Sequence, residues 1–165
     1  MTTELAEFVK RIAEVKGVPF ENIAFYGSSA GGFAALALTA KVEGSTAVAI
    51  NPQVDSMAYS GVSQVDLVAQ TCTEMTKEDI KDRFQNRVDM KSAWSENDKS
   101  KAFFVQNLED GHRYKIDFKP MWESLRGEEP NDGINRLGHH TAWIYRQEVG
   151  HIPETKKWRR RSLTC

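Results

Sequence analysis

The sequence predicts an α/β fold: a parallel sheet of about four strands with helices on both faces, and a helical insertion between the second and third strands. Short apolar runs alternate with helical segments along the chain, which is the pattern of parallel strands joined by crossover helices. A glycine-rich turn joins the first of these runs directly to a helix. The chain has 165 residues, a length typical of one domain and sufficient to bury a core without disulfides.

The first expected element is an amphipathic helix near the start of the chain. Apolar residues recur from Leu5 to Val15 with the spacing of one helical face. Thr3 can cap the start of this helix, and Gly17 and Pro19 are typical of its end.

A strand, a tight turn and a second helix are expected next. The run Ile23–Tyr26 is short and apolar and predicts a buried strand. The small residues of 27–32 follow, and Phe33–Leu38 then has the composition of a strong helix. Gly44 ends that helix, and Thr46–Ile50 predicts the next strand.

The middle of the chain, from residue 53 to residue 100, is less regular and forms the predicted insertion. Thr76 to Asp79 resembles a helix start. Ile80, Phe84 and Val88 have the spacing of one face of that helix.

The last third of the chain predicts two further strands. Ala102–Gln106 is a third apolar run, and Thr141–Arg146 is the fourth strand candidate. Between them, Phe118–Leu125 can form a helix with a proline in its first turn. The glycine- and proline-rich residues 126–138 predict a loop. A last helix is expected from Glu154 onward.

Composition excludes several classes of protein. Apolar residues make up 40% and charged residues 27% of the chain, which argues against disorder. The net charge of −1 excludes strong overall attraction to nucleic acid or to an anionic membrane. The basic run 156–161 could contact nucleic acid, but such a run is more often the solvated end of a helix.

Targeting signals and metal-binding motifs are absent from the sequence. No apolar run has the length of a membrane span, and the start of the chain, Met1 to Lys10, contains no apolar core of signal-peptide length. A cytoplasmic location is therefore expected. Cys72 and Cys165 are too few for a disulfide framework. Because no pair of cysteines or histidines has metal-ligand spacing, neither a metal nor a cofactor is expected.

The strongest chemical signal is Gly27-Ser28-Ser29-Ala30-Gly31, which fits the pattern G-x-S-x-G. A strand before it and a helix after it form the context of a nucleophile elbow. Side chains at Gly27 and Gly31 are expected to collide with the neighbouring strand and helix. Ser29 is then the nucleophile, and the N–H of Ala30 would bind an oxyanion. The alternatives are a phosphate-binding loop, although the lysine of a P-loop is missing, and a plain strand–helix turn.

A serine nucleophile needs a base, and position along the chain ranks the four histidines. Active sites of parallel sheets lie at the carboxyl ends of the strands. His151 follows the last strand candidate and is therefore the expected base, with a surface histidine as the alternative. His139 and His140 precede that strand and belong at the opposite edge. His112 lies after the third strand, in the same loop as the best acid.

The acid that orients the base is expected after the third strand. Glu109 and Asp110 both follow that strand, and Asp110 is the preferred candidate. Asp110 could instead be a simple turn residue, because an Asp-Gly pair favours turns. Asp117 and Asp132 are weaker candidates because they lie farther from the strand end.

Four further residues are expected to contact the substrate, because they flank the nucleophile or follow a strand. They are Ser28, Asn51, Gln53 and His112. For Asn51-Pro52-Gln53, a simple strand-terminating turn is an equally good interpretation.

These segments together resemble the C-terminal portion of an α/β-hydrolase. The stretches VPFENIAFYGSSAGGFAALAL, AVAINPQVD, FFVQNLEDGH and EVGHIP are similar to pieces of serine esterases and acyltransferases linked to glycan or capsule biosynthesis, over about residues 10 to 155. The order Ser29, Asp110, His151 is that of the family triad. The resemblance implies an enzyme acting on an ester, and a peptidase shares the same elbow.

The resemblance also predicts an incomplete sheet. The family usually has several strands before the elbow strand, one of whose loops supplies a second oxyanion donor, whereas only 22 residues precede Ile23 here. We therefore expect residues 1–165 to form a single hydrolase-like domain without those strands. Its exposed strand edge would need a second copy or another partner to cover it. The alternative function is that of a truncated, inactive hydrolase that serves as a binding or interaction subunit.

Overall fold

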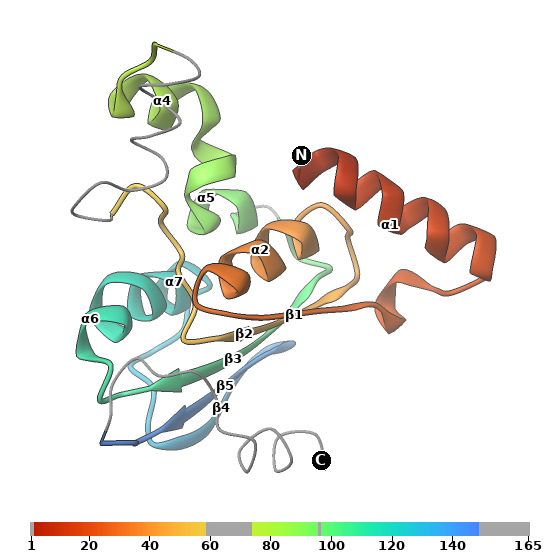
Figure 1. Cartoon of the computed structure of the whole chain (residues 1–165). Coiled ribbons are helices and arrows are strands. Elements are labelled where there is room, and N and C mark those ends of the chain that lie inside the picture. The colour runs from red at the N-terminus through yellow and green to blue at the C-terminus, as the bar shows by residue number, and fades with distance from the viewer. Residues whose placement is uncertain (1, 59–73, 96, 149–165) are drawn as a thin grey trace.

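A five-stranded sheet with the order β1-β2-β3-β5-β4 is the centre of the fold (Figure 1). The computed structural model describes residues 2–58, 74–95 and 97–148. The strands are β1 (Ala24–Ser28), β2 (Thr46–Ile50), β3 (Lys101–Asn107), β4 (Gly133–Leu137) and β5 (His140–Tyr145). Neighbours among β1, β2, β3 and β5 are parallel, and β4 is antiparallel to β5. The α/β class and the predominantly parallel sheet are thereby confirmed.

The prediction of a loop over residues 126–138 is wrong for its second half, which forms β4. Gly138, with φ of 56°, and His139 make the turn into β5, and Leu137 pairs with His140. Only alternate residues of β4 are half-buried, and the side chain of Ile134 is 66% exposed. An edge strand that buries so little has a weak hydrophobic pattern, and its glycines and polar residues indicate a loop instead.

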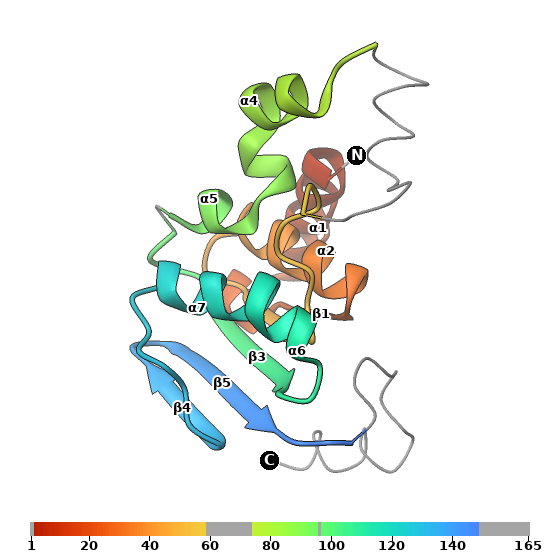
Figure 2. The ribbon, with the colours of Figure 1, turned by 90° about the vertical axis from the view of Figure 1, so that its left-hand side faces the viewer.

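The described helices lie on one face of the sheet (Figures 1 and 2), whereas helices on both faces were expected. They are α1 (Thr2–Lys16), η1 (Phe20–Asn22), α2 (Ala30–Thr39), α4 (Lys77–Val88), α5 (Met90–Trp94), α6 (Gly111–Arg113), η3 (Tyr114–Phe118) and α7 (Lys119–Ser124). None of these helices is both long enough and apolar enough to cross a membrane. The expected helix from Glu154 onward lies outside the described residues.

Alternate strand residues form the core beneath these helices. Small buried residues of the sheet, such as Ala47 and Ala49, let α2 pack closely against β1 and β2. Farther along, the ring of Phe104 meets those of Phe118 and Trp122 edge-on, with centroids 5.7 and 6.3 Å away. These aromatic contacts fasten the helical run α6–η3–α7 to β3.

The amphipathic helix α1 forms as predicted, but its apolar face is not buried in the described chain. Ala6 and Ala13 are the residues of α1 that are buried, and α1 packs against α2. Phe8 and Val15 remain 60% and 84% exposed. The helical spacing identified the helix correctly, and tertiary packing selected a different face.

The predicted insertion between β2 and β3 is helical in its described part. Thr76 caps α4 through a reciprocal capping box with Asp79, as the sequence indicated. Ile80 and Val88 are buried together, but Phe84 is exposed because its backbone leaves the helical conformation there, with φ of −130° and ψ of 30°. In Figure 1 this insertion extends away from the sheet above α5.

The start of β5 makes the stability of the fold depend on pH. The Nδ1 of His140 accepts a hydrogen bond from the N–H of Ala102 at 3.2 Å. Burial, with a smaller effect of His139, lowers the pKa of His140 to about 4. An unfolded histidine takes up a proton near pH 6.5, so stability is present above that pH and is lost as the pH falls towards 4.

We predict that the free energy of unfolding falls by about 1 to 2 kcal/mol between pH 7 and pH 5 because of His140. Urea unfolding at both pH values measures this loss. His140→Asn retains an acceptor for Ala102 and should remove the loss, whereas His139→Asn should retain most of it. An equal pH dependence in the wild type and His140→Asn would contradict the assignment.

Candidate functional site

Ser29 occupies a strained turn between β1 and α2. Its backbone has φ of 53° and ψ of −118°, a region that residues with a side chain rarely adopt. Backbone hydrogen bonds hold the turn: the N–H of Ser29 donates to Ile50, and its carbonyl accepts from Phe33 and Gln53. The strain is therefore supported by contacts with both β2 and α2, as a nucleophile elbow requires.

Gly27 and Gly32 make room for this turn, whereas the sequence pattern predicted Gly27 and Gly31. A Cβ on Gly27 would lie 2.1 Å from the carbonyl oxygen of Gly31, so no side chain fits there. A Cβ on Gly31 would meet nothing within 4 Å, and the expected collision at Gly31 is wrong. The second steric requirement falls on Gly32, where a Cβ would lie 2.8 Å from that of Pro52.

Ala30 begins α2 directly after Ser29. The first N–H groups of a helix have no acceptor within the helix, and the helix dipole makes this end electropositive. The residue is exposed. The arrangement is suited to binding negative charge beside Ser29.

Asp110 lies just beyond the carboxyl end of β3, as Ser29 does beyond the carboxyl end of β1. Both residues are therefore at the same end of the parallel strands. Asp110 is buried and caps α6 by accepting a 3.4 Å hydrogen bond from the N–H of Arg113. Strand β2 separates the two strands that carry Ser29 and Asp110. The predicted base, His151, lies outside the described residues.

The other acid candidates make hydrogen bonds and ion pairs that stabilise the fold. Asp117 is fully buried, accepts a 2.8 Å hydrogen bond from the N–H of Val54 and forms a 2.9 Å ion pair with Arg113. It thereby ties the segment after β2 to the helices after β3. Glu109 and Asp132 are exposed and both pair with the guanidinium of Arg146, at 3.0 Å each.

His139 and His140, at the start of β5, lie at the amino ends of the parallel strands and so at the opposite end of the sheet from Ser29, as predicted. His140 is the first residue of β5 and pairs with Leu137. His139 occupies the turn before it, and their rings are in contact, with centroids 4.2 Å apart. His112 lies instead on α6, beside Asp110, and is exposed.

The predicted substrate-contact residues differ in their burial and in their hydrogen bonds within the protein. Ser28 ends β1 and is half-buried. Gln53 is half-buried, and its N–H is bonded to the carbonyl of Ser29. Asn51 is buried, with a φ of 38°, and its amide bonds within the protein to Asn107 and Tyr145. Asn51 is therefore part of the framework that shapes this edge.

The sequence did not reveal the part that Asn107 plays at this edge. Its side chain is buried and bonds to the backbone of Gln147, just beyond β5. Together with Asn51 it forms a row of amide contacts across the ends of β2, β3 and β5. The only sequence signal was an asparagine at the end of two apolar runs, which is also common in plain turns.

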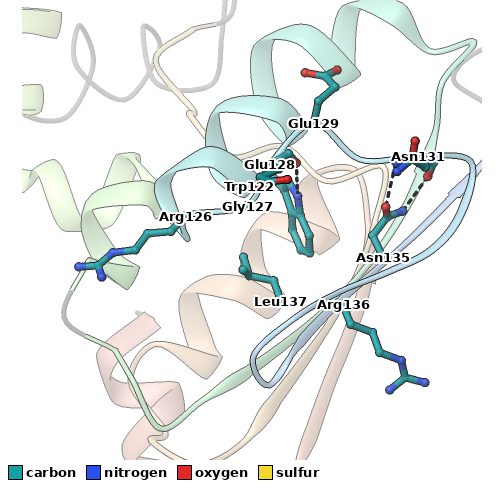
Figure 3. Close-up of a pocket in the computed structure, with 9 residues that line it drawn as sticks. All are labelled: Trp122, Arg126, Gly127, Glu128, Glu129, Asn131, Asn135, Arg136 and Leu137. Carbon is teal, nitrogen blue, oxygen red and sulfur yellow. Dashed lines mark hydrogen bonds between the residues drawn. The ribbon is translucent and has the colours of Figure 1, made fainter.

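A separate pocket of about 300 Å³ lies across the sheet from Ser29, between the end of α7 and β4 (Figure 3). Gly127 lies against Trp122, whose indole N–H donates to the carbonyl of Glu128. Glu129 lines the same pocket, and its bonds from Lys119 and Tyr114 lower its pKa. Strands β1 and β4 are the two outermost strands of the sheet, on opposite sides of it. This pocket lies beside β4 and therefore does not belong to the Ser29 site.

Nothing in the described residues gathers three or more His, Cys, Asp or Glu side chains around a metal position. Among the described residues, those near the Ser29 turn offer a hydroxyl, the buried carboxyl of Asp110 and the first N–H groups of α2.

Comparison with protein-family models finds no family that matches this chain, and comparison with curated proteins finds no relative.

The two glycines of the elbow provide a matched test of the turn. We predict that Gly27→Ala destabilises the protein by about 3 kcal/mol or more, because its Cβ would overlap backbone atoms. Gly31→Ala adds the same methyl group to open space in a helix and should change stability by less than about 1 kcal/mol. Thermal unfolding of both variants measures the difference, and equal losses would contradict the model of the turn.

The buried ion pair gives a second prediction. Asp117→Ala removes a fully buried carboxylate that pairs with the partly buried guanidinium of Arg113 and accepts from the N–H of Val54, and should cost about 3 to 5 kcal/mol. The exposed Arg146→Ala removes two surface ion pairs, and should cost at most about 1 kcal/mol. Urea unfolding distinguishes them, and similar losses would show that Asp117 does not tie these segments together.

Proposed function

We propose that this chain is a serine hydrolase or acyltransferase that acts on an ester through Ser29. The observation that supports the proposal most strongly is the backbone of Ser29, held at φ 53° and ψ −118° between a parallel strand and a helix. A strained serine at this place in a sheet is typical of the nucleophile of an α/β-hydrolase. We also propose that the five-stranded sheet belongs to an α/β-hydrolase fold.

In the proposed reaction, the Oγ of Ser29 attacks the acyl carbonyl. His151 takes the hydroxyl proton and passes it to the leaving alcohol. Asp110 holds the imidazole in the required tautomer, and the N–H of Ala30 stabilises the oxyanion. Water or a second hydroxyl then attacks the carbonyl of the acyl-serine, and His151 takes its proton. The bond from the acyl carbon to the Oγ of Ser29 breaks, and His151 returns the proton to that Oγ.

The class of ester is a further part of the proposal. The sequence resembles acyltransferases and esterases that act on glycan-linked acyl groups, and acyl sugars are therefore the first substrates to test. Ala30 follows Ser29 directly, the N–H of Gln53 bonds to the carbonyl of Ser29, and His112 is exposed on α6 after β3. These small or polar groups are compatible with a sugar ester.

A binding or interaction subunit without activity is the second candidate function. Two observations favour it. Among the described residues, β1 is an edge strand that pairs with β2 alone, and the apolar face of α1 is exposed. Both are surfaces that another chain could cover.

Covalent labelling distinguishes these two functions. We predict that a fluorophosphonate probe labels the wild-type chain and that Ser29→Ala abolishes labelling, because the probe reacts with an activated serine. Ser28→Ala is the matched control, since it removes the neighbouring hydroxyl and should still be labelled. Mass spectrometry of the labelled peptide locates the adduct.

The opposite results are equally informative. Labelling that persists in Ser29→Ala would contradict the assignment of the nucleophile. An unlabelled wild-type chain with a normal cooperative unfolding transition would favour the interaction subunit.

A further inference from the structure

A short antiparallel bridge between Asp55 and Asp89 joins the helical insertion to the segment that follows β2. Two backbone hydrogen bonds flank this pair, each 2.9 Å long. The N–H of Ser56 donates to the carbonyl of the residue before Asp89, and the N–H of Met90 donates to the carbonyl of the residue before Asp55. Because the bonds lie on either side of the pair, the side chains of Asp55 and Asp89 are directly opposite each other, at the close spacing of a non-hydrogen-bonded pair.

The same segment holds the turn that carries Ser29. The N–H of Gln53 donates to the carbonyl of Ser29 at 3.1 Å. The next N–H, that of Val54, donates to the fully buried carboxylate of Asp117 at 2.8 Å. Asp55 follows directly in the sequence. Three consecutive residues therefore connect the Ser29 turn to the bridge with the insertion.

The two carboxylates of the bridge are each fixed by a hydrogen bond from their own chain segment. The Oδ1 of Asp55 accepts from the N–H of Met57 at 2.8 Å, and the Oδ1 of Asp89 accepts from the N–H of Lys91 at 3.0 Å. Asp89 is 9% exposed. Like charges on directly opposite residues of a strand pair repel each other and destabilise the pairing. The bridge is therefore weakest when both aspartates are ionised.

The charged groups around the pair oppose this repulsion only in part. The Nζ of Lys91 lies 3.7 Å from the Oδ2 of Asp89. On the other side, Asp117 accepts from the N–H of Asp55 at 3.5 Å, and its own charge is paired with Arg113 at 2.9 Å. Burial raises the pKa of Asp89 above its usual value, and the Asp55 carboxylate adds to the rise, although Lys91 acts against it. The folded protein thus favours the protonated form of Asp89.

We propose that Asp55 and Asp89 form a pH-sensitive contact between the helical insertion and the segment that holds the Ser29 turn. Proton uptake by Asp89 removes one of the two opposed charges. A group that binds its proton more tightly in the folded state stabilises that state at low pH, and this stabilisation is lost as the pH rises. The contact is therefore firm in acid and weaker near neutral pH. The inference goes beyond the proposed serine chemistry and does not depend on it.

The test is amide hydrogen exchange, measured by NMR between pH 7 and pH 4.5. The N–H groups of Ser56 and Met90 report on the bridge, and that of Gln53 reports on the Ser29 turn. The N–H of Asn51, which donates to β3, is the internal reference, because the titrating histidine of β5 destabilises the whole fold over the same range. We expect the protection of the three reporters relative to Asn51 to rise about threefold or more as the pH falls.

Two variants and a matched control assign the effect to the pair. Asp89→Asn and Asp55→Asn each remove one of the opposed charges and retain the Oδ1 acceptor. Both should raise the relative protection of Ser56 and Met90 at pH 7 and remove most of its change with pH. Asp98→Asn makes the same substitution at an exposed position after α5, and should behave like the wild type.

Three results would count against the proposal. A relative protection that is constant with pH in the wild type would overturn it. A pH dependence that Asp55→Asn leaves unchanged would also overturn it, because the burial of Asp89 alone would then be sufficient. A rise at the bridge that does not extend to Gln53 would overturn the link to the Ser29 turn. Fluorophosphonate labelling is a separate measurement, so failure of the serine chemistry is distinguishable from each of these results.

Discussion

The close approach of the first turn of α2 to the end of β1 is the constraint on which the candidate site depends. The position where a Cβ of Gly27 would stand lies 2.1 Å from the carbonyl oxygen of Gly31. This approach turns the chain by the shortest route from strand to helix and forces Ser29 to a positive φ. A side chain at that position would push α2 away from the sheet. The position of Ser29 at the end of β1 and the start of α2 directly after it both follow from this contact.

A second set of contacts connects the carboxyl ends of the strands. Asn51 and Asn107 link the ends of β2, β3 and β5 through amide groups, and Asp117 fastens the segment after β2 to the helices after β3. These groups are buried, so each bond would be costly to leave unmade. The chain segments that leave the strands therefore have defined starting points.

The described helices cover one face of the sheet (Figure 2). Buried alanines in β2, β3 and β5 leave small side chains on this face, so helices can pack close to it. The ring of Phe104 and the aromatic rings of α7 and η3 fill the remaining space. On the other face, Val48, Phe103 and Trp143 are only half-buried. The asymmetry concentrates the core between the sheet and the helices that follow β1 and β3.

The sequence by itself determined the elements whose signals are local. Helical spacing, apolar runs, the Thr76 cap and the G-x-S-x-G turn were sufficient to predict the parallel strands, most of the helices and the conformation around Ser29, and strand order placed Asp110 at the same edge. Only the tertiary structure decided which side of α1 is buried, that β4 pairs beside β5, that Gly32 and not Gly31 is sterically required, and that Asn51 and Asn107 connect three strands. These features depend on which residues distant in the chain meet across the sheet. Local periodicity contains no information about such contacts.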